Sequence, residues 1–374
     1  MTLPRRNSLI RRLPGHPAER TGGHLCAVGC AGQQTAGAGR TLGGTAVEGG
    51  KPLIEAIYDT GSGEVTDGGT GKPATPGFPY QHDDLAGAAS NNIEARIREL
   101  KEDGIDKELA FPNAVLALFH YPDKALRERV FRIYNEHIAD LQERSDGHFH
   151  GVGLINWWDP KGTRSTLEEL KSLGLKTFLL PLNPGKDDEG NIYDYGSTGM
   201  DAVWDEIEAS GVLVSHHIGE TPPKTPCQHN SVVVGMMVNV DSFREQFAKY
   251  VFSGILDRHP ALKIGWFEGG IAWVPTALQD AEHMLASYQH MFNHQLEHEV
   301  RHYWDNHMSA SFMVDPLGLR LIDQIGVDNV MWSSDYPHNE STWGYSEKSL
   351  ANVVGAVGPE DAAKIVSTNV QRFL

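Results

Sequence analysis

The feature that most constrains the fold is a regular alternation of helical and strand-like segments, which runs from residue 85 to the end of the chain. Helical patterns such as NNIEARIRELKEDG (91–104) alternate with short apolar stretches such as LKIGWFEGG (262–270). Strands that are nearly all apolar are covered on both faces, and strands that alternate with helices are usually parallel. The pattern therefore predicts an α/β fold built on a parallel sheet.

The number of repeats favours a closed barrel over an open sheet. We count seven strand-and-helix units, and a (β/α)8 TIM barrel requires one more. An open, doubly wound sheet is the alternative, but no Gly-x-Gly-x-x-Gly turn follows an early strand. We therefore predict a TIM barrel whose first strand is either hidden in the amino-terminal segment or damaged. The stretch 51–69 has the pattern of a strand, a turn and a strand, and we interpret it as an excursion from the barrel.

Residues 1–50 differ in composition from the rest of the chain. They are rich in glycine and arginine, contain almost no acidic residues and show no sustained apolar periodicity. A segment of this composition cannot bury enough apolar surface to offset its conformational entropy. We expect residues 1–50 to be a poorly structured segment with little contact to the barrel, or the product of a wrongly assigned start or reading frame. Residues 51–374 then form the barrel domain.

Charge and cysteine content exclude several classes of partner. The net charge of −17 argues against nucleic acid and against an anionic membrane surface. No apolar run approaches the roughly eighteen residues that a membrane span requires. Cys26, Cys30 and Cys227 do not form a disulfide framework, which indicates a reducing, cytoplasmic setting, and we interpret Cys26 and Cys30 as incidental. The expected partner is a small-molecule substrate.

Acidic and imidazole side chains collect at the carboxyl ends of the predicted strands, which is where catalytic residues lie in β/α barrels. They are His216, His217 and Glu220 after the fifth strand, Glu268 after the sixth, and Asp335 and His338 after the eighth. Carboxylates that meet at one mouth repel one another, so they take up protons or require a cation. A divalent metal ion meets this requirement, and imidazole with carboxylate suits Zn, which we expect first, or Mn or Fe.

Adjacent His216 and His217 cannot both face this site, because successive side chains of a strand point to opposite sides. We choose His217 as the residue that faces the metal, since its parity matches a mouth-facing position. Other strand ends carry amides, among them Asn113 after the second strand.

Three sequence runs resemble the amidohydrolase-related metal-dependent hydrolases of the amidohydrolase superfamily. The runs are HHIG (216–219), FEGGIAWVPTALQDAEHM (267–284) and MWSSDYPHNESTW (331–343). The branch that they resemble includes aminocarboxymuconate-semialdehyde decarboxylase and the resorcylate decarboxylases, and the resemblance covers roughly residues 92–374. It implies an eight-stranded barrel with one catalytic metal ion, and a homodimer, because relatives commonly pair.

The resemblance also implies roles for individual residues. His217 would be a metal ligand, and Asp335 would be both a ligand and the catalytic proton acceptor. Glu268 is a further catalytic residue, which could serve as general base. We expect His216 and His338 to contact the substrate.

Two features depart from the family pattern. The family's first strand carries Asp-x-His or His-x-His followed by Glu, whereas the nearest trace here is His16 with Glu19, and Pro14 stands where the partner belongs. The decarboxylases of the branch usually have a histidine after the sixth strand, where this chain has Glu268. Protonation of a ring carbon needs a group poised near neutral pH, so Glu268 weakens the decarboxylase hypothesis.

The leading hypothesis is therefore a metal-dependent hydrolase, in which Asp335 takes a proton from a metal-activated water that attacks a carbonyl group. The alternative is a non-oxidative decarboxylase of an aromatic or unsaturated carboxylic acid. Further alternatives are a dinuclear-iron oxygenase and a metal-free partner subunit. Tryptophans near the predicted mouth would suit a planar or apolar substrate: Trp157, Trp158, Trp266 and Trp343.

Overall fold

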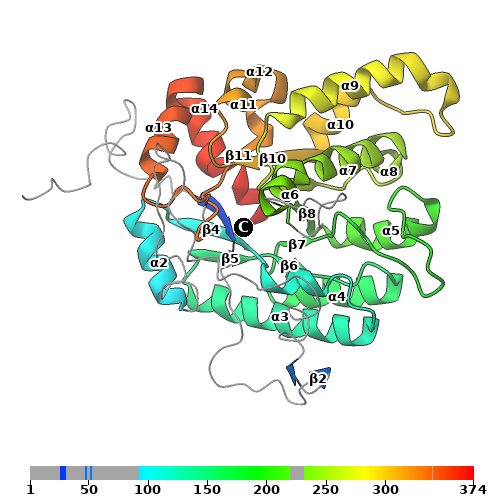
Figure 1. Ribbon diagram of the computed structural model, residues 1–374, viewed down its shortest axis with the longest axis horizontal. Helices are drawn as coiled ribbons and strands as arrows, with labels where there is room; N and C mark the ends of the chain where they lie inside the picture. Colours follow the sequence, from blue (N-terminus) through cyan, green and yellow to red (C-terminus); the bar gives the residue numbers. More distant parts are fainter. Residues whose placement is uncertain (1–25, 31–46, 49–50, 53–91, 220–230, 339) are drawn as a thin grey trace, which may run out of the picture.

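The fold is seen in a computed structural model, which describes residues 26–30, 47–48, 51–52, 92–219, 231–338 and 340–374. Figure 1 shows the barrel strands in the centre of the molecule and the helices around them. The strands of the barrel are β1 (Cys26–Cys30), β4 (Lys107–Phe111), β5 (Phe149–Gly151), β6 (Gly153–Leu154), β7 (Thr177–Leu179), β8 (Leu213–His217), β9 (Ile264–Phe267), β10 (Met308–Phe312) and β11 (Val330–Trp332).

These strands are parallel and follow one another in chain order. One set pairs in the order β1-β4-β5, and the other in the order β6-β7-β8-β9-β10-β11. Strands β5 and β6 continue one another, because the N–H of Val152 between them donates to the carbonyl of Ala110 in β4 at 3.0 Å. Strand β1 also lies beside β11, although no ladder joins these two in the described part of the chain. The predicted TIM barrel is thus confirmed.

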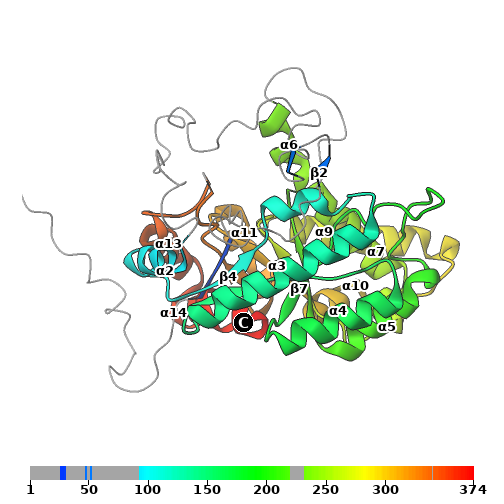
Figure 2. The same cartoon turned by 90° about the horizontal axis from the view of Figure 1, so that it is seen from below.

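Helices cover the outside of the barrel between successive strands. They are α2 (Ile93–Glu102), α3 (Lys124–Arg144), α4 (Pro160–Ser172), α5 (Asp201–Ser210), α6 (Ser231–Asn239), α7 (Asp241–Phe252), α8 (Ile255–Arg258), α9 (Trp273–Tyr288), α10 (Val300–His307), α11 (Pro316–Arg320), α12 (Ile322–Ile325), α13 (Ser346–Val357) and α14 (Pro359–Ala363). Shorter turns are η3 (Ala114–Leu118), η4 (Thr198–Met200), η5 (Gln289–Met291), η6 (Val327–Asn329), η7 (Lys364–Thr368) and η8 (Val370–Phe373). Figure 2 shows α6 standing away from the other helices.

Several helices begin where a short polar side chain satisfies the first free N–H groups. Asn92 accepts a hydrogen bond from the N–H of Ala95 at 2.7 Å, and Asp123 accepts one from Leu126 at 3.0 Å. Asp159 does the same at the start of α4, where Pro160 is the first helical residue and has no N–H to satisfy. Such caps typically stabilise a helix by about 1 kcal/mol, so local sequence fixes these starts.

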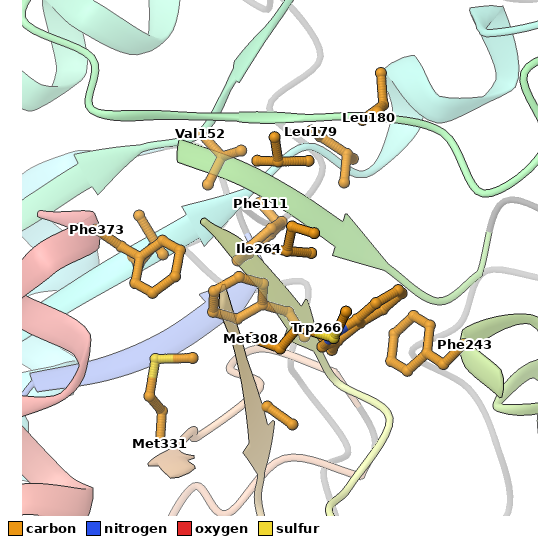
Figure 3. Close-up of a cluster of buried hydrophobic side chains, with 14 of the residues drawn as sticks. Phe111, Val152, Leu179, Leu180, Phe243, Ile264, Trp266, Met308, Met331 and Phe373 are labelled. Atoms are coloured by element: carbon orange, nitrogen blue, oxygen red, sulfur yellow. The ribbon is translucent and has the colours of Figure 1, made fainter. Parts of the chain in front are cut away.

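Apolar side chains fill both the interior of the barrel and the space between the strands and their covering helices. Figure 3 shows a cluster of these buried side chains, which includes Phe111, Ile264, Trp266, Met308 and Met331. Trp266 and Trp157 are 0 % exposed, whereas Trp158 and Trp343 are half-buried. Trp157 and Trp266 are therefore core residues, and they do not form the substrate-facing aromatic surface that the sequence suggested.

The first strand corrects one expectation about the amino-terminal segment. Cys26–Cys30 pairs along its whole length with β4, in a register that places Cys30 opposite Phe111. These five residues, CAVGC, are small, so they carry little of the apolar signal by which a strand is recognised. They form the barrel's first strand, so this part of the amino-terminal segment does contact the barrel. The boundary at residue 50 stays a prediction, because most residues around it lie outside the described ranges.

The stretch 51–69, interpreted as an excursion, lies mostly outside the described residues. Its first two residues form β3 (Lys51–Pro52), which pairs antiparallel with β2 (Val47–Glu48) and with no barrel strand in the described part. Among the described residues, no helix is both long enough and apolar enough to cross a membrane.

Candidate functional site

Side chains from three strand ends meet at one point of the barrel mouth. His217 is the last residue of β8, Glu268 directly follows β9, and Asp335 and His338 follow β11. Nε2 of His217 lies 2.5 Å from Oε2 of Glu268. Nδ1 of His338 lies 3.3 Å from Oδ1 of Asp335 and 3.6 Å from Oε1 of Glu268. The structure thus brings together His217, Glu268, Asp335 and His338, which we call the acid–imidazole cluster.

Both ring nitrogens of His217 face oxygen acceptors. Nδ1 lies 2.7 Å from the carbonyl oxygen of Ile218, so it carries the hydrogen and donates it. Nε2 then faces the Glu268 carboxylate, and a neutral imidazole has no second hydrogen to offer there. A cation, either a proton or a metal ion, is needed at this contact. An imidazole whose other nitrogen donates to a backbone carbonyl is also oriented as metal-ligating histidines usually are.

Asp335 is the most deeply buried acid of the acid–imidazole cluster. Its side chain is 3 % exposed, and its Oδ2 has no hydrogen-bond partner among the described residues. Burial, together with the nearby charge of Glu268, raises the pKa of Asp335 above its usual value. A buried carboxylate oxygen without a partner is costly, so this atom is where a bound cation or a substrate proton would be most stabilising.

The pKa of Glu268 shifts in the opposite direction, below its usual value. Burial alone would raise the pKa of Glu268, but the charges and hydrogen bonds of His217 and His338 outweigh burial and lower it. Glu268 is therefore the charged acid of the acid–imidazole cluster, and Asp335 is the acid that holds a proton more readily.

The backbone at both acids adopts a conformation that L-residues rarely use. Glu268 has φ of +71° and Asp335 has φ of +53°. Residues other than glycine in this region are strained and persist only where surrounding contacts hold them, often at functional sites. The N–H of Glu268 donates to Oγ of Ser311 at 3.1 Å. This contact helps to hold the turn after β9.

A buried ion pair holds the turn after β11. Arg96 of α2 pairs with Glu108 of β4 through two contacts, at 2.5 Å and 2.8 Å, and both side chains are 0 % exposed. The same guanidinium donates to the carbonyl of Tyr336 at 2.9 Å, and it lies 5.2 Å from the centre of the Tyr336 ring. Because Tyr336 directly follows Asp335, Arg96 fixes the segment that carries the buried acid.

Glu340 is an acid of the site that the strand pattern does not predict. Glu268, Asp335, His338 and Glu340 each offer a ligand atom, and these four atoms lie within 4.8 Å of one another. Glu340 belongs to the run SDYPHNE, but it follows the strand by several residues, where strand-end reasoning no longer applies. With His217 beside Glu268, the donors are three carboxylates and two imidazoles. This set, with one buried oxygen left unpartnered, fits a divalent metal ion.

His216 lies apart from the acid–imidazole cluster. It is 0 % exposed, its Nδ1 donates to the carbonyl of Leu180 at 2.8 Å, and its Nε2 accepts from the hydroxyl of Tyr250 at 2.8 Å. Its ring stacks on Trp266 with centres 5.0 Å apart. Strand alternation points His216 away from His217 and into the layer between the strand and α7, and its contact with substrate stays a prediction.

Three further candidates, His16, Glu19 and Glu220, lie outside the described residues. The described ligand set is therefore drawn from β8 and from the turns after β9 and β11.

Comparison with known proteins agrees with this architecture. The sequence profile of the amidohydrolase family matches residues 85–374. Among curated proteins, none matches the sequence significantly. Solved structures with a similar fold include a 5-carboxyvanillate decarboxylase from Sphingomonas paucimobilis, with a TM-score of 0.65, 20 % identity, and coverage of 94 % of this chain and 98 % of that one.

Two other similar structures are dihydroxybenzoate decarboxylases. The 2,6-dihydroxybenzoate decarboxylase from Rhizobium has a TM-score of 0.61 and 18 % identity, with coverage of 75 % of this chain and 87 % of that chain. A dihydroxybenzoic acid decarboxylase from Polaromonas was solved with manganese and the inhibitor 2-nitroresorcinol. It has a TM-score of 0.62 and 18 % identity, with coverage of 75 % of this chain and 85 % of that chain. At these identities the likeness extends to the fold. By the family profile that spans most of its length, the chain belongs to the amidohydrolase family.

Proposed function

We propose that this enzyme of the amidohydrolase superfamily is a metal-dependent carboxy-lyase, which removes CO2 without oxidation from an aromatic or unsaturated carboxylic acid. The observation that carries the proposal is the acid–imidazole cluster, with the unpartnered, buried Oδ2 of Asp335 at the strand ends. The likeness to decarboxylases of hydroxylated benzoates supports this chemistry over hydrolysis. The order of the two leading hypotheses from the sequence is thereby reversed.

The donor set favours Mn²⁺ over the Zn²⁺ expected from the sequence. Carboxylate ligands suit Mn²⁺, whereas zinc sites draw more of their ligands from imidazole and thiolate. Glu268, Asp335 and Glu340 would supply oxygen atoms, and His217 and His338 nitrogen atoms. When bound, such an ion would attract the substrate carboxylate and offset its repulsion from the acids.

Asp335 would move the proton that decarboxylation requires, because burial and the nearby charge of Glu268 favour its protonated form. A π electron pair of the substrate takes the proton from the Asp335 carboxyl and forms a C–H bond at the carbon that bears the carboxylate. The bond from this carbon to the carboxylate then breaks, its electron pair re-forms the π bond, and CO2 leaves. Solvent would return a proton to Asp335 after CO2 leaves, because Nδ1 of His338 would be bound to the metal ion and could not carry one. Asp335 would thus supply the proton transfer for which Glu268 is unsuited.

The test is a search for CO2 release. The full-length protein is loaded with Mn²⁺ and incubated with a panel of acids that includes 2,6-dihydroxybenzoate and 5-carboxyvanillate, the substrates named for the similar structures. Reactions in D2O should place one deuterium on the carbon that lost CO2, and Asp335→Asn should abolish both signals. Turnover of a parallel panel of esters, amides and lactones, without CO2 release from any acid, would contradict the proposal.

A further inference from the structure

Asn113, which follows β4, contacts the acid–imidazole cluster at His338. Its Nδ2 lies 2.9 Å from Nε2 of His338, although the two residues are 225 positions apart in sequence. The other nitrogen of the same ring, Nδ1, faces the carboxylates of Asp335 and Glu268 at 3.3 Å and 3.6 Å. The His338 ring is therefore held at both nitrogens, by an amide on one side and by acids on the other.

In the part of the chain that the structure describes, Asn113 does not cap the helix that follows it, although asparagine usually does so at such a position. Asn113 stands at the amino-terminal cap of the short helix η3 (Ala114–Leu118), where an asparagine side chain normally accepts a hydrogen bond from the helix. Within the described residues, its side chain makes no such capping bond. Asn92, at the cap of α2, does make one, to the N–H of Ala95 at 2.7 Å. The side chain of Asn113 is thus directed to His338 instead of to its own helix.

The group at Nε2 determines what His338 presents at Nδ1. A neutral imidazole has one N–H and one lone pair, so fixing one nitrogen fixes the other. An amide can donate through Nδ2 or, after a half-turn, accept through Oδ1. When the amide donates, Nδ1–H points at the carboxylates. When it accepts the hydrogen from Nε2, Nδ1 offers a lone pair to a metal ion. Asn113 can satisfy both forms of His338 without displacing the ring.

We infer that Asn113 is a positioning residue, which orients His338 and so determines how tightly the acid–imidazole cluster holds a divalent metal ion. This inference rests on the metal dependence in the proposed function. Asn113 acts through His338, as second partners of metal-ligating histidines do, and losing such partners typically costs ten- to hundredfold in metal affinity.

Two substitutions separate orientation from simple packing. Asn113→Leu keeps the approximate size but can neither donate nor accept. Asn113→Asp can accept the Nε2 hydrogen, which is the form that a metal-bound His338 needs. The matched control is Asn92→Leu, which removes an asparagine from another helix cap, with a loss of stability but no contact to the acid–imidazole cluster.

The measurement is the Kd for Mn²⁺ of the full-length proteins, by titration calorimetry. We expect Asn113→Leu to weaken binding about ten- to hundredfold. Asn113→Asp and Asn92→Leu should stay within about threefold of the wild type. Binding by Asn113→Leu as tight as that of the wild type would overturn the inference, and so would an equal loss in Asn113→Asp, which would indicate packing alone.

The outcomes also separate this inference from the proposed chemistry. A wild type that binds Mn²⁺ but releases CO2 from no acid overturns the carboxy-lyase proposal, while the affinities of the Asn113 variants still test the orienting role. A wild type that binds no divalent ion overturns both.

Discussion

Nε2 of His217 lies 2.5 Å from Oε2 of Glu268, across the carboxyl ends of two adjacent strands, β8 and β9. Since Nδ1 of the same ring already donates to a backbone carbonyl, the contact calls for a cation between imidazole and carboxylate. Glu268 also faces His338 with its second oxygen, at 3.6 Å. Glu268 therefore links the two imidazoles of the acid–imidazole cluster.

Replacing Glu268 with glutamine tests this link. Glu268→Gln keeps the shape but removes the charge, so we expect Mn²⁺ affinity to fall by at least about tenfold, as measured by equilibrium dialysis. Glu282→Gln, at an exposed position of α9, is the matched control and should bind as the wild type does. Unchanged affinity in Glu268→Gln would place the ion elsewhere.

Asp335→Asn tests the proton-transfer role. The substitution preserves size but removes the carboxyl proton, so turnover should fall by a factor of at least about 100. The melting temperature should stay within a few degrees, because the burial cost of the acid is also removed. Turnover within about threefold of the wild type would rule out Asp335 as the group that moves the proton.

The two adjacent histidines of β8 should behave differently. His217→Ala should empty the metal site with little effect on folding. His216→Ala should keep the metal but destabilise the fold by about 2–4 kcal/mol, because it leaves a cavity beside Trp266 and removes the partner of the buried Tyr250 hydroxyl. Metal analysis and urea unfolding of both variants measure this. Metal loss in His216→Ala with full occupancy in His217→Ala would reverse the assignment.

His307, which lies outside the acid–imidazole cluster, should make the stability of the fold depend on pH. Burial, followed by the charges of Lys263, His302 and His298, lowers the pKa of His307, while a bond from its Nδ1 to the carbonyl of Leu262 opposes the shift. Below the unfolded pKa of about 6.5 the unfolded chain binds a proton that the folded chain does not, so stability falls as the pH drops.

The check is a comparison with His307→Asn, whose amide can donate in place of Nδ1 but does not titrate. The fall in urea midpoint between pH 7 and pH 5 should be smaller in the variant than in the wild type. Equal slopes in the two proteins would show that His307 is not a source of the acid sensitivity.

The barrel and most of the site could be predicted because they depend on local pattern. Apolar strands that alternate with helices specify a parallel barrel, and any polar residue just after a strand must then lie at the mouth. The sequence pattern alone therefore predicts that His217, Glu268 and Asp335 lie together. The alternation of side chains along a strand also predicts that His217 and His216 point to opposite sides. It does not predict that His216 contacts Tyr250 of α7.

The remainder depends on contacts that local pattern does not encode. Strand β1 is five small residues, and only its pairing with β4 makes it recognisable. Asn113 and Arg96 reach the turn after β11 across more than 200 positions of sequence. Glu340 lies in an irregular segment, where neither a period of 2 nor a period of 3.6 can indicate which way a side chain points.

The most direct measurement is the anomalous scattering of manganese in a crystal grown with saturating Mn²⁺. The account predicts one strong peak among His217, Glu268, Asp335 and His338, with Glu340 turned toward it, and the loss of this peak in Glu268→Gln. A well-ordered acid–imidazole cluster with no peak, or a peak only at another place on the molecule, would contradict the central claim that these strand ends form a metal centre.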